Sequence, residues 1–310
     1  MPTHDRFLAV LLGVAPLVAA QAATGTESQA TAAAADKAAC KAETTRNGAG
    51  QATGDAVCAV KHLFQRRIRR QPEKEPVEMT VGSPPMQSED SDTPGNGNWE
   101  LNLAFGGEFA GGEHAIEFPI IDLNYGIGDR VQLTYGVPYA SLREEDGTGL
   151  LQSAHGVGDS EFGLKYRFYD NEDRGLSLAV YPQVRVRTPG ANEAVSDGGT
   201  AYALPLILVS EFEHFSLTAN IGMEFADGEH STFASFGAGR RLTDRLAVMA
   251  ELAGHDLDND ARHVLINLGV RQKLSDAHSI SASIGRDVDV GAGEHRLSYA
   301  MINYQMLLGE

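Results

Sequence analysis

Residues 158–168 read GDSEFGLKYRF, and the character of the side chain changes at every position. One set of alternate positions is apolar: Phe162, Leu164, Tyr166 and Phe168. The other set is charged or small: Glu161, Gly163, Lys165 and Arg167. Successive side chains of a β-strand point to opposite faces, so this stretch predicts a strand with one apolar and one charged face. Both soluble sandwiches and transmembrane barrels use such strands.

The same alternation continues from residue 98 to the end of the chain. We interpret it as about twelve strands of roughly ten residues, a length that spans a membrane when the strand is tilted. The predicted strands cover residues 98–105, 115–125, 130–140, 158–168, 175–187, 201–211, 215–225, 232–241, 245–254, 262–273, 279–287 and 296–308. Those at 115–125, 232–241 and 296–308 change face partway, which indicates either a β-bulge or an incorrectly assigned register in each.

The connections between these strands alternate in length. Short turns such as GIGDR (126–130) and TDR (243–245) alternate with longer, acid- and glycine-rich connections such as residues 142–157 and 188–200. This alternation is typical of outer-membrane barrels, which have tight periplasmic turns and longer outer loops. The sequence therefore predicts an all-β fold, an antiparallel transmembrane β-barrel over residues 97–310. An even number of strands would place its C-terminus and the N-terminal extension in the periplasm.

The N-terminus has the features of a signal peptide. Arg6 precedes the apolar run FLAVLLGVAPLVAA (7–20), which is short for a membrane-spanning helix, and small residues follow it. Cleavage after Ala20 or Ala22 would fit, so we expect residues 1–22 to be a signal peptide of an exported protein. The alternative is an uncleaved N-terminal anchor.

Residues 23–96 differ in kind from the rest of the chain. They are rich in Ala, then in basic residues, and then in Pro, Ser and acids, which is typical of a tether or plug-like extension with little core of its own. Cys40 and Cys58 are the two cysteines of the chain. In an exported protein the simplest interpretation is one disulfide between them, and two free thiols are the alternative.

Charge and hydropathy exclude two classes of protein. The formal net charge of −17 argues against a nucleic-acid partner. The mean hydropathy of −0.22 argues against a bundle of membrane helices but is compatible with alternating strands.

The stretch GVGDSEFGLKYRF (156–168), preceded by YGIGDRVQLTYGVPY (125–139), resembles the outer-membrane barrel family named after the meta-pathway of phenol degradation. The resemblance covers the chain from Asn98 onward and not the extension. It implies an outer-membrane barrel that takes up small solutes, often apolar or aromatic. The motif is structural and brings no catalytic residues with it.

Catalytic and metal-binding patterns are weak in this chain. His214 and Ser216 have the spacing that lets a histidine activate a serine on one face of a strand, as in outer-membrane lipid hydrolases. We expect both to point into the lumen, whereas a lipid hydrolase needs them to face lipid. No zinc motif or phosphate-binding loop is present, so we expect no cofactor, no metal site and no enzymatic activity.

The residues that would point into the lumen are the best candidates for a functional site. They are Glu161, Lys165, Arg167, Tyr181, Arg185, Arg187, Glu224, Glu251, Asn267 and Arg271. Charges of both signs could pair across a narrow lumen and support the wall, or they could select a solute. We expect pairing for most of them, and solute contact for Arg185 and Arg187.

The sequence thus favours an outer-membrane barrel for passive passage of small solutes. Its expected partners are outer-membrane lipid, lipopolysaccharide and a small-molecule solute. Two alternatives remain, a non-transporting structural or surface barrel and a lipid hydrolase. The sequence leaves the oligomeric state open, and also whether the extension fills the barrel.

Overall fold

The computed structural model describes residues 76–145, 151–196, 198–258, 262–292 and 295–309. The predicted signal peptide, the Cys40–Cys58 pair and most of the extension lie outside these residues. Within the described residues, no helical segment has the length and apolar character needed to cross a membrane.

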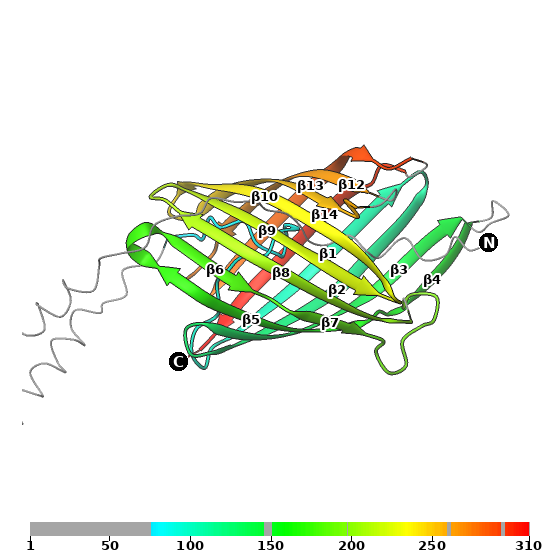
Figure 1. Ribbon diagram of the computed structural model, residues 1–310, viewed down its shortest axis with the longest axis horizontal. Helices are drawn as coiled ribbons and strands as arrows, with labels where there is room; N and C mark the ends of the chain where they lie inside the picture. The colour runs from blue at the N-terminus through cyan, green and yellow to red at the C-terminus, as the bar shows by residue number, and fades with distance from the viewer. Residues whose placement is uncertain (1–75, 146–150, 197, 259–261, 293–294, 310) are drawn as a thin grey trace, which may run out of the picture. The chain divides into compact units, whose positions relative to one another are not determined.

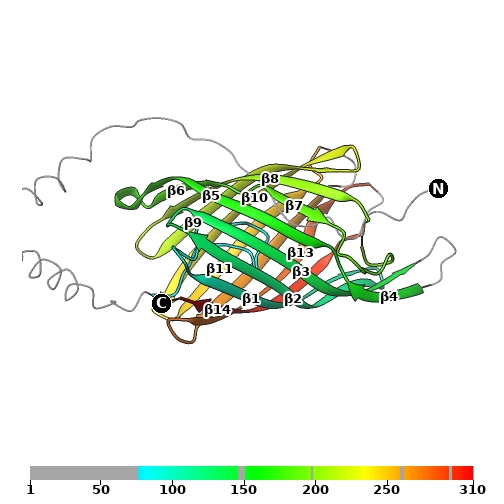
Figure 2. The ribbon, with the colours of Figure 1, turned by 90° about the horizontal axis from the view of Figure 1, so that it is seen from below.

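The chain from Trp99 onward forms one continuous antiparallel sheet (Figures 1 and 2). Its segments are β1 (Trp99–Ala110), β2 (Glu113–Ile127), β3 (Val131–Glu145), β4 (Leu151–Val157), β5 (Ser160–Asn171), β6 (Leu176–Val180), β7 (Gln183–Val186), β8 (Thr200–Glu211), β9 (Phe215–Ala226), β10 (Glu229–Thr243), β11 (Leu246–His255), β12 (His263–Lys273), β13 (His278–Val290) and β14 (Ser298–Leu308). One 3-10 turn, η1 (Glu172–Arg174), joins β5 to β6.

Pairing of the first and last segments closes the sheet into a barrel. Trp99 of β1 lies opposite Leu308 of β14, and the pairing continues without a break to Phe109 and Ser298. Two pairs of segments are collinear, because β4 and β5 both pair with β3, and β6 and β7 both lie between β5 and β8. The fourteen segments therefore make a closed twelve-strand barrel, which confirms the predicted fold and strand count.

Proline and glycine account for the interruptions. Gly158 and Asp159 separate β4 from β5, and Tyr181 and Pro182 separate β6 from β7, where proline has no N–H for the ladder. The register also shifts on both sides of β2, next to Pro119.

Of the three predicted face changes, the one in 115–125 is a bulge. The one in 232–241 is not, because the pairing of β10 is regular from Ala234 to Arg241 and shifts only beyond it, between Arg241 and Thr243. The one in 296–308 is not a bulge either, since β14 pairs without a shift on both sides. Its inward Tyr299 and Met301 pack against Ala104 and Leu265. Because this patch of the inner wall is apolar, both faces of β14 carry apolar residues there, and the sequence alternation is lost although the strand is regular.

The two faces of the wall differ in exposure as the alternation predicts. Phe162, Leu164, Tyr166 and Phe168 point outward and are each between 41 and 47 % exposed, whereas Lys165 between them is 4 % exposed. The outer surface is apolar and the inner surface carries the polar residues, which is the arrangement of a barrel in a membrane.

The barrel has two ends that we name by their residues. The proximal rim carries Trp99, Leu308 and the turns at 128–130 and 244–245. The distal rim carries the ends of β11 and β13 and the start of β12, at His255, Val290 and His263.

Candidate lumenal site

Residues 76–98, here called the lumenal segment, run inside the barrel (cyan trace, Figure 1). The backbone N–H of Val77 donates to the carbonyl of Asp244 at 2.8 Å, and that of Gly97 donates to the carbonyl of Gly126 at 2.9 Å. Both contacts lie near the proximal rim, so the segment enters and leaves the barrel at the same end. Between them, Val81, Met86 and other side chains of the segment are fully buried.

The turn of the lumenal segment reaches deepest and is held by hydrogen bonds from three strands. The carbonyl of Pro85 accepts from Ser283 Oγ of β13 at 2.7 Å and from the Tyr299 hydroxyl of β14 at 3.2 Å. The carboxylate of Glu251 on β11 accepts from the backbone N–H of Gln87 at 2.9 Å, and from the backbone N–H and hydroxyl of Ser88. A buried carboxylate therefore takes up donors that the turn would otherwise leave unpaired.

Acidic residues of the lumenal segment pair with basic residues of the wall. Lys165 Nζ lies 3.1 Å from Asp90 Oδ1 and 3.8 Å from Glu89 Oε2. Two further pairs are Arg167 with Asp92 at 3.2 Å and Arg271 with Glu78 at 2.7 Å. The acid-rich stretch of the extension thus neutralises bases that the wall buries.

Glycines of β10 and β12 leave room for the lumenal segment. A Cβ at Gly239 would lie 1.7 Å from the carbonyl oxygen of Met79, and a Cβ at Gly237 would lie 2.7 Å from the side chain of Val81. At Gly269 a Cβ would lie 2.6 Å from Met86 Sδ. The wall is therefore shaped to receive this segment, because any other residue at Gly239 would collide with its backbone.

Other predicted lumenal residues contact one another or the wall. Arg185 of β7 pairs with Glu224 of β9 at 2.8 Å. The Arg187 guanidinium lies 3.3 Å from Glu193 in the connection after β7. Glu161 accepts a hydrogen bond from Gln183 at 3.1 Å.

Tyr181 and Asn267 also lie on this inner wall. The hydroxyl of Tyr181 donates to Thr134 Oγ1 at 2.9 Å, and Lys165 Nζ lies 5.1 Å from the centre of the Tyr181 ring. Asn267 donates to Glu251 at 3.4 Å. The structure brings Lys165, Arg167, Glu251, Asn267 and Arg271 together around the lumenal segment, and Arg185, Arg187 and Glu224 into separate pairs.

The acids of the lumenal segment were missed by sequence reasoning. Glu78, Glu89, Asp90 and Asp92 lie in the part interpreted as an extension, where acids are usually solvated. One signal could have found them. The predicted lumen held several bases, and the acidic run SEDSD (88–92) lies next to the first strand.

The proposed hydrolase pair is not assembled. Ser216 is fully buried and its hydroxyl donates to the carbonyl of Met79 at 2.8 Å. His214 lies before β9, with its side chain exposed and 3.5 Å from Glu213. No group of three or more His, Cys, Asp or Glu among the described residues is placed to hold a metal ion.

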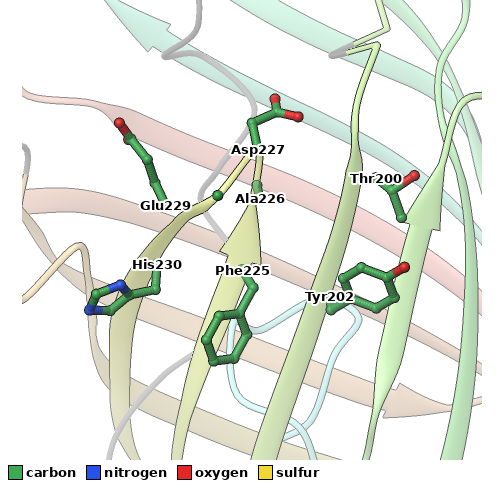
Figure 3. Close-up of a pocket in the computed structure, with 8 residues that line it drawn as sticks. Thr200, Tyr202, Phe225, Ala226, Asp227, Glu229 and His230 are labelled. Carbon is green, nitrogen blue, oxygen red and sulfur yellow. The ribbon is translucent and has the colours of Figure 1, made fainter.

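A shallow pocket of about 230 Å³ lies at the β9–β10 hairpin (Figure 3). The rings of Tyr202, Phe225 and His230 line one side of it, and Thr200, Asp227 and Glu229 lie beyond them. Tyr202 and Phe225 are register partners on β8 and β9, and both are exposed. Aromatic residues at the end of an outward face are typical of a membrane interface, so this pocket is separate from the lumenal site.

Solved structures with a similar fold are outer-membrane channels and porins. The COG4313 outer membrane channel from Pseudomonas putida F1 superposes with a TM-score of 0.58, at 14 % identity over 74 % of this chain and 100 % of that chain. The KdgM porin gives a TM-score of 0.47, at 9 % identity over 66 % of this chain and 98 % of that one. The Ralstonia pickettii toluene transporter TbuX gives 0.41, at 11 % identity over 69 % and 90 %.

No curated protein matches this chain in sequence. The fold is that of an outer-membrane channel. A family described as "Putative MetA-pathway of phenol degradation" matches residues 109–301, which is more than half of the chain and most of the barrel. The chain belongs to this family.

Proposed function

We propose that this protein is an outer-membrane channel through which small solutes pass without energy coupling, and that the lumenal segment controls its opening. The observation that carries the proposal is the set of contacts between segment and wall. Besides the apolar contacts of Val81 and Met86 with Met249, they include ion pairs and hydrogen bonds, which water can replace when the segment moves. The closed barrel and the family membership support the same function.

The solute would be small and apolar or aromatic. The name of the family refers to phenol degradation, and compounds of that class are small aromatic molecules. While the segment occupies the lumen, it would restrict passage to small solutes. The segment's buried Val81 and Met86 would expose apolar surface to a solute if the segment shifted.

The same features support a proposal for the placement of the chain in the cell. Residues 1–22 would direct export, residues 23–96 would start in the periplasm and end in the lumen, and residues 97–310 would cross the outer membrane. The apolar outer face would contact lipid, and the exposed aromatic residues near the distal rim would contact lipopolysaccharide.

One observation favours a second function, that of a structural barrel that conducts nothing. Lys165, Arg167 and Arg271 are all paired with acids of the lumenal segment. These pairs could serve only to hold the segment in place and keep the lumen filled. A test must therefore ask whether the segment moves.

A reversible tether between segment and wall provides that test. The hydroxyls of Ser91 and Ser177 lie 2.6 Å apart, on the segment and on β6. Ser91→Cys with Ser177→Cys, in a chain whose Cys40 and Cys58 are replaced by Ser, would allow a disulfide between them. We expect the reduced protein to show discrete conductance steps in planar bilayers, and oxidation to suppress these steps until reductant is added.

The two single-cysteine variants are the matched controls and should not respond to oxidation. Silence of the reduced protein, together with no entry of small solutes into liposomes and a folded barrel by heat-modifiability, would establish the structural barrel instead.

A further inference from the structure

Two histidines face each other at the distal rim of the barrel. His255 ends β11, His263 begins β12, and the two are direct register partners. Both follow the inward alternation of their strands, with His255 only 4 % exposed and the His263 side chain 13 % exposed. Directly opposite residues have Cβ atoms about 4.5–5.5 Å apart, which allows two imidazoles to reach one ion.

Asp287 of β13 orients the ring of His263. Its Oδ2 lies 2.8 Å from His263 Nδ1 and also accepts from the backbone N–H of Leu297 at 2.9 Å. The carboxylate is thereby fixed, and it holds the proton of the imidazole on Nδ1. Metal-binding histidines have this kind of carboxylate partner, because it leaves the lone pair on Nε2 for the metal.

The ring of His255 supplies an independent observation. Its Nε2 is buried and has no hydrogen-bond partner among the described residues. A buried nitrogen without a partner costs free energy, and such an atom in a native structure calls for an explanation. A bound metal ion would supply the missing partner.

We propose that His255 and His263 bind one divalent transition-metal ion at the distal rim of the lumen. Imidazole nitrogens favour Zn²⁺, Ni²⁺ or Cu²⁺ over Ca²⁺ and Mg²⁺, which prefer oxygen. Two protein ligands leave the remaining positions of the ion to water, and Asp287 balances part of its charge. The ion would link β11 to β12 where the lumen opens.

Binding of Zn²⁺ to the untagged full chain tests the proposal. We expect equilibrium dialysis to show one bound Zn²⁺ per unaltered chain. His255→Gln and His263→Gln should each lower the affinity for Zn²⁺ at least tenfold. Asp287→Asn should weaken binding by about 10- to 100-fold, because it removes the carboxylate that orients His263. The Cu²⁺ form should show two nitrogen ligands by electron paramagnetic resonance.

His230→Gln is the matched control. His230 belongs to β10 at the same end of the barrel, 60 % of its side chain is exposed, and it lies 3.9 Å from Asp258. This variant should keep the affinity of the unaltered chain. The proposal is overturned if the unaltered chain binds no Zn²⁺, or if His263→Gln binds it as tightly as His230→Gln does. His263→Gln decides the outcome even if the buried His255 cannot be replaced without loss of folding.

Discussion

Lys165 of β5 lies 3.1 Å from Asp90 of the lumenal segment, and both side chains are largely buried. Lys165→Met would leave Asp90 and Glu89 without their cation inside the barrel. Breaking a buried pair from one side costs about 3 kcal/mol, because the remaining charge stays desolvated. We expect the segment to loosen before the barrel does, with faster hydrogen exchange of the amides of residues 88–92.

Lys273→Met is the control for this prediction. Lys273 lies 3.1 Å from Asp276 at the proximal rim, where Asp276 is 68 % exposed. Because Asp276 is solvated, loss of Lys273 leaves no buried charge behind, and exchange in the segment should not change. Equal exchange in both variants would mean that the Lys165 pair does not hold the segment.

Gly239→Ala should displace the start of the lumenal segment. The added Cβ would lie 1.7 Å from the carbonyl oxygen of Met79, and backbone atoms cannot rotate away as a side chain can. We expect the amides of residues 77–81 to exchange at least tenfold faster, which corresponds to about 1.4 kcal/mol. Gly136→Ala is the control, because the nearest atom to its Cβ would lie 3.7 Å away.

Gly163→Ala tests the wall of the barrel itself. A Cβ at Gly163 would lie 2.5 Å from the ring of Tyr181, whose hydroxyl donates to Thr134 Oγ1. Overpacking of this kind costs about 1–3 kcal/mol, so the free energy of unfolding in urea should fall by that amount. Tyr181→Phe should cost about 1 kcal/mol, since it keeps the ring and loses only the hydrogen bond. A larger loss in Tyr181→Phe than in Gly163→Ala would contradict this view of the pair.

The position of Ser216 predicts that the protein does not react with serine-directed reagents. Its hydroxyl is buried under the lumenal segment and donates to Met79 rather than to a histidine. We expect no labelling by a fluorophosphonate in lipid bilayers. Labelling that Ser216→Ala abolishes would revive the lipid hydrolase as a function.

Much of the barrel could be predicted from the sequence, because its outer face is governed by local alternation. The outward Phe162 and Phe168 follow directly from strand geometry. The alternation of 296–308 does not follow polarity, because Tyr299 and Met301 are apolar and yet point inward. A polarity pattern identifies a face only where the inner wall is polar.

Only the wall side of the lumenal site could be predicted from the sequence. Lys165 and Arg167 were expected to lie in the lumen, but their partners Asp90 and Asp92 lie 75 residues earlier. The lumenal segment has the Pro-, Ser- and acid-rich composition of a disordered stretch. Its order comes from contacts supplied by distant strands, and no local pattern records such contacts.

Both described ends of the lumenal segment are anchored at the proximal rim, Val77 at Asp244 and Gly97 at Gly126. Residues 77–97 therefore enter and return through one opening, as a hairpin does. It follows for biogenesis that the seam between β1 and β14 can close before the segment enters. The segment can also withdraw from the finished ring without any strand leaving the sheet.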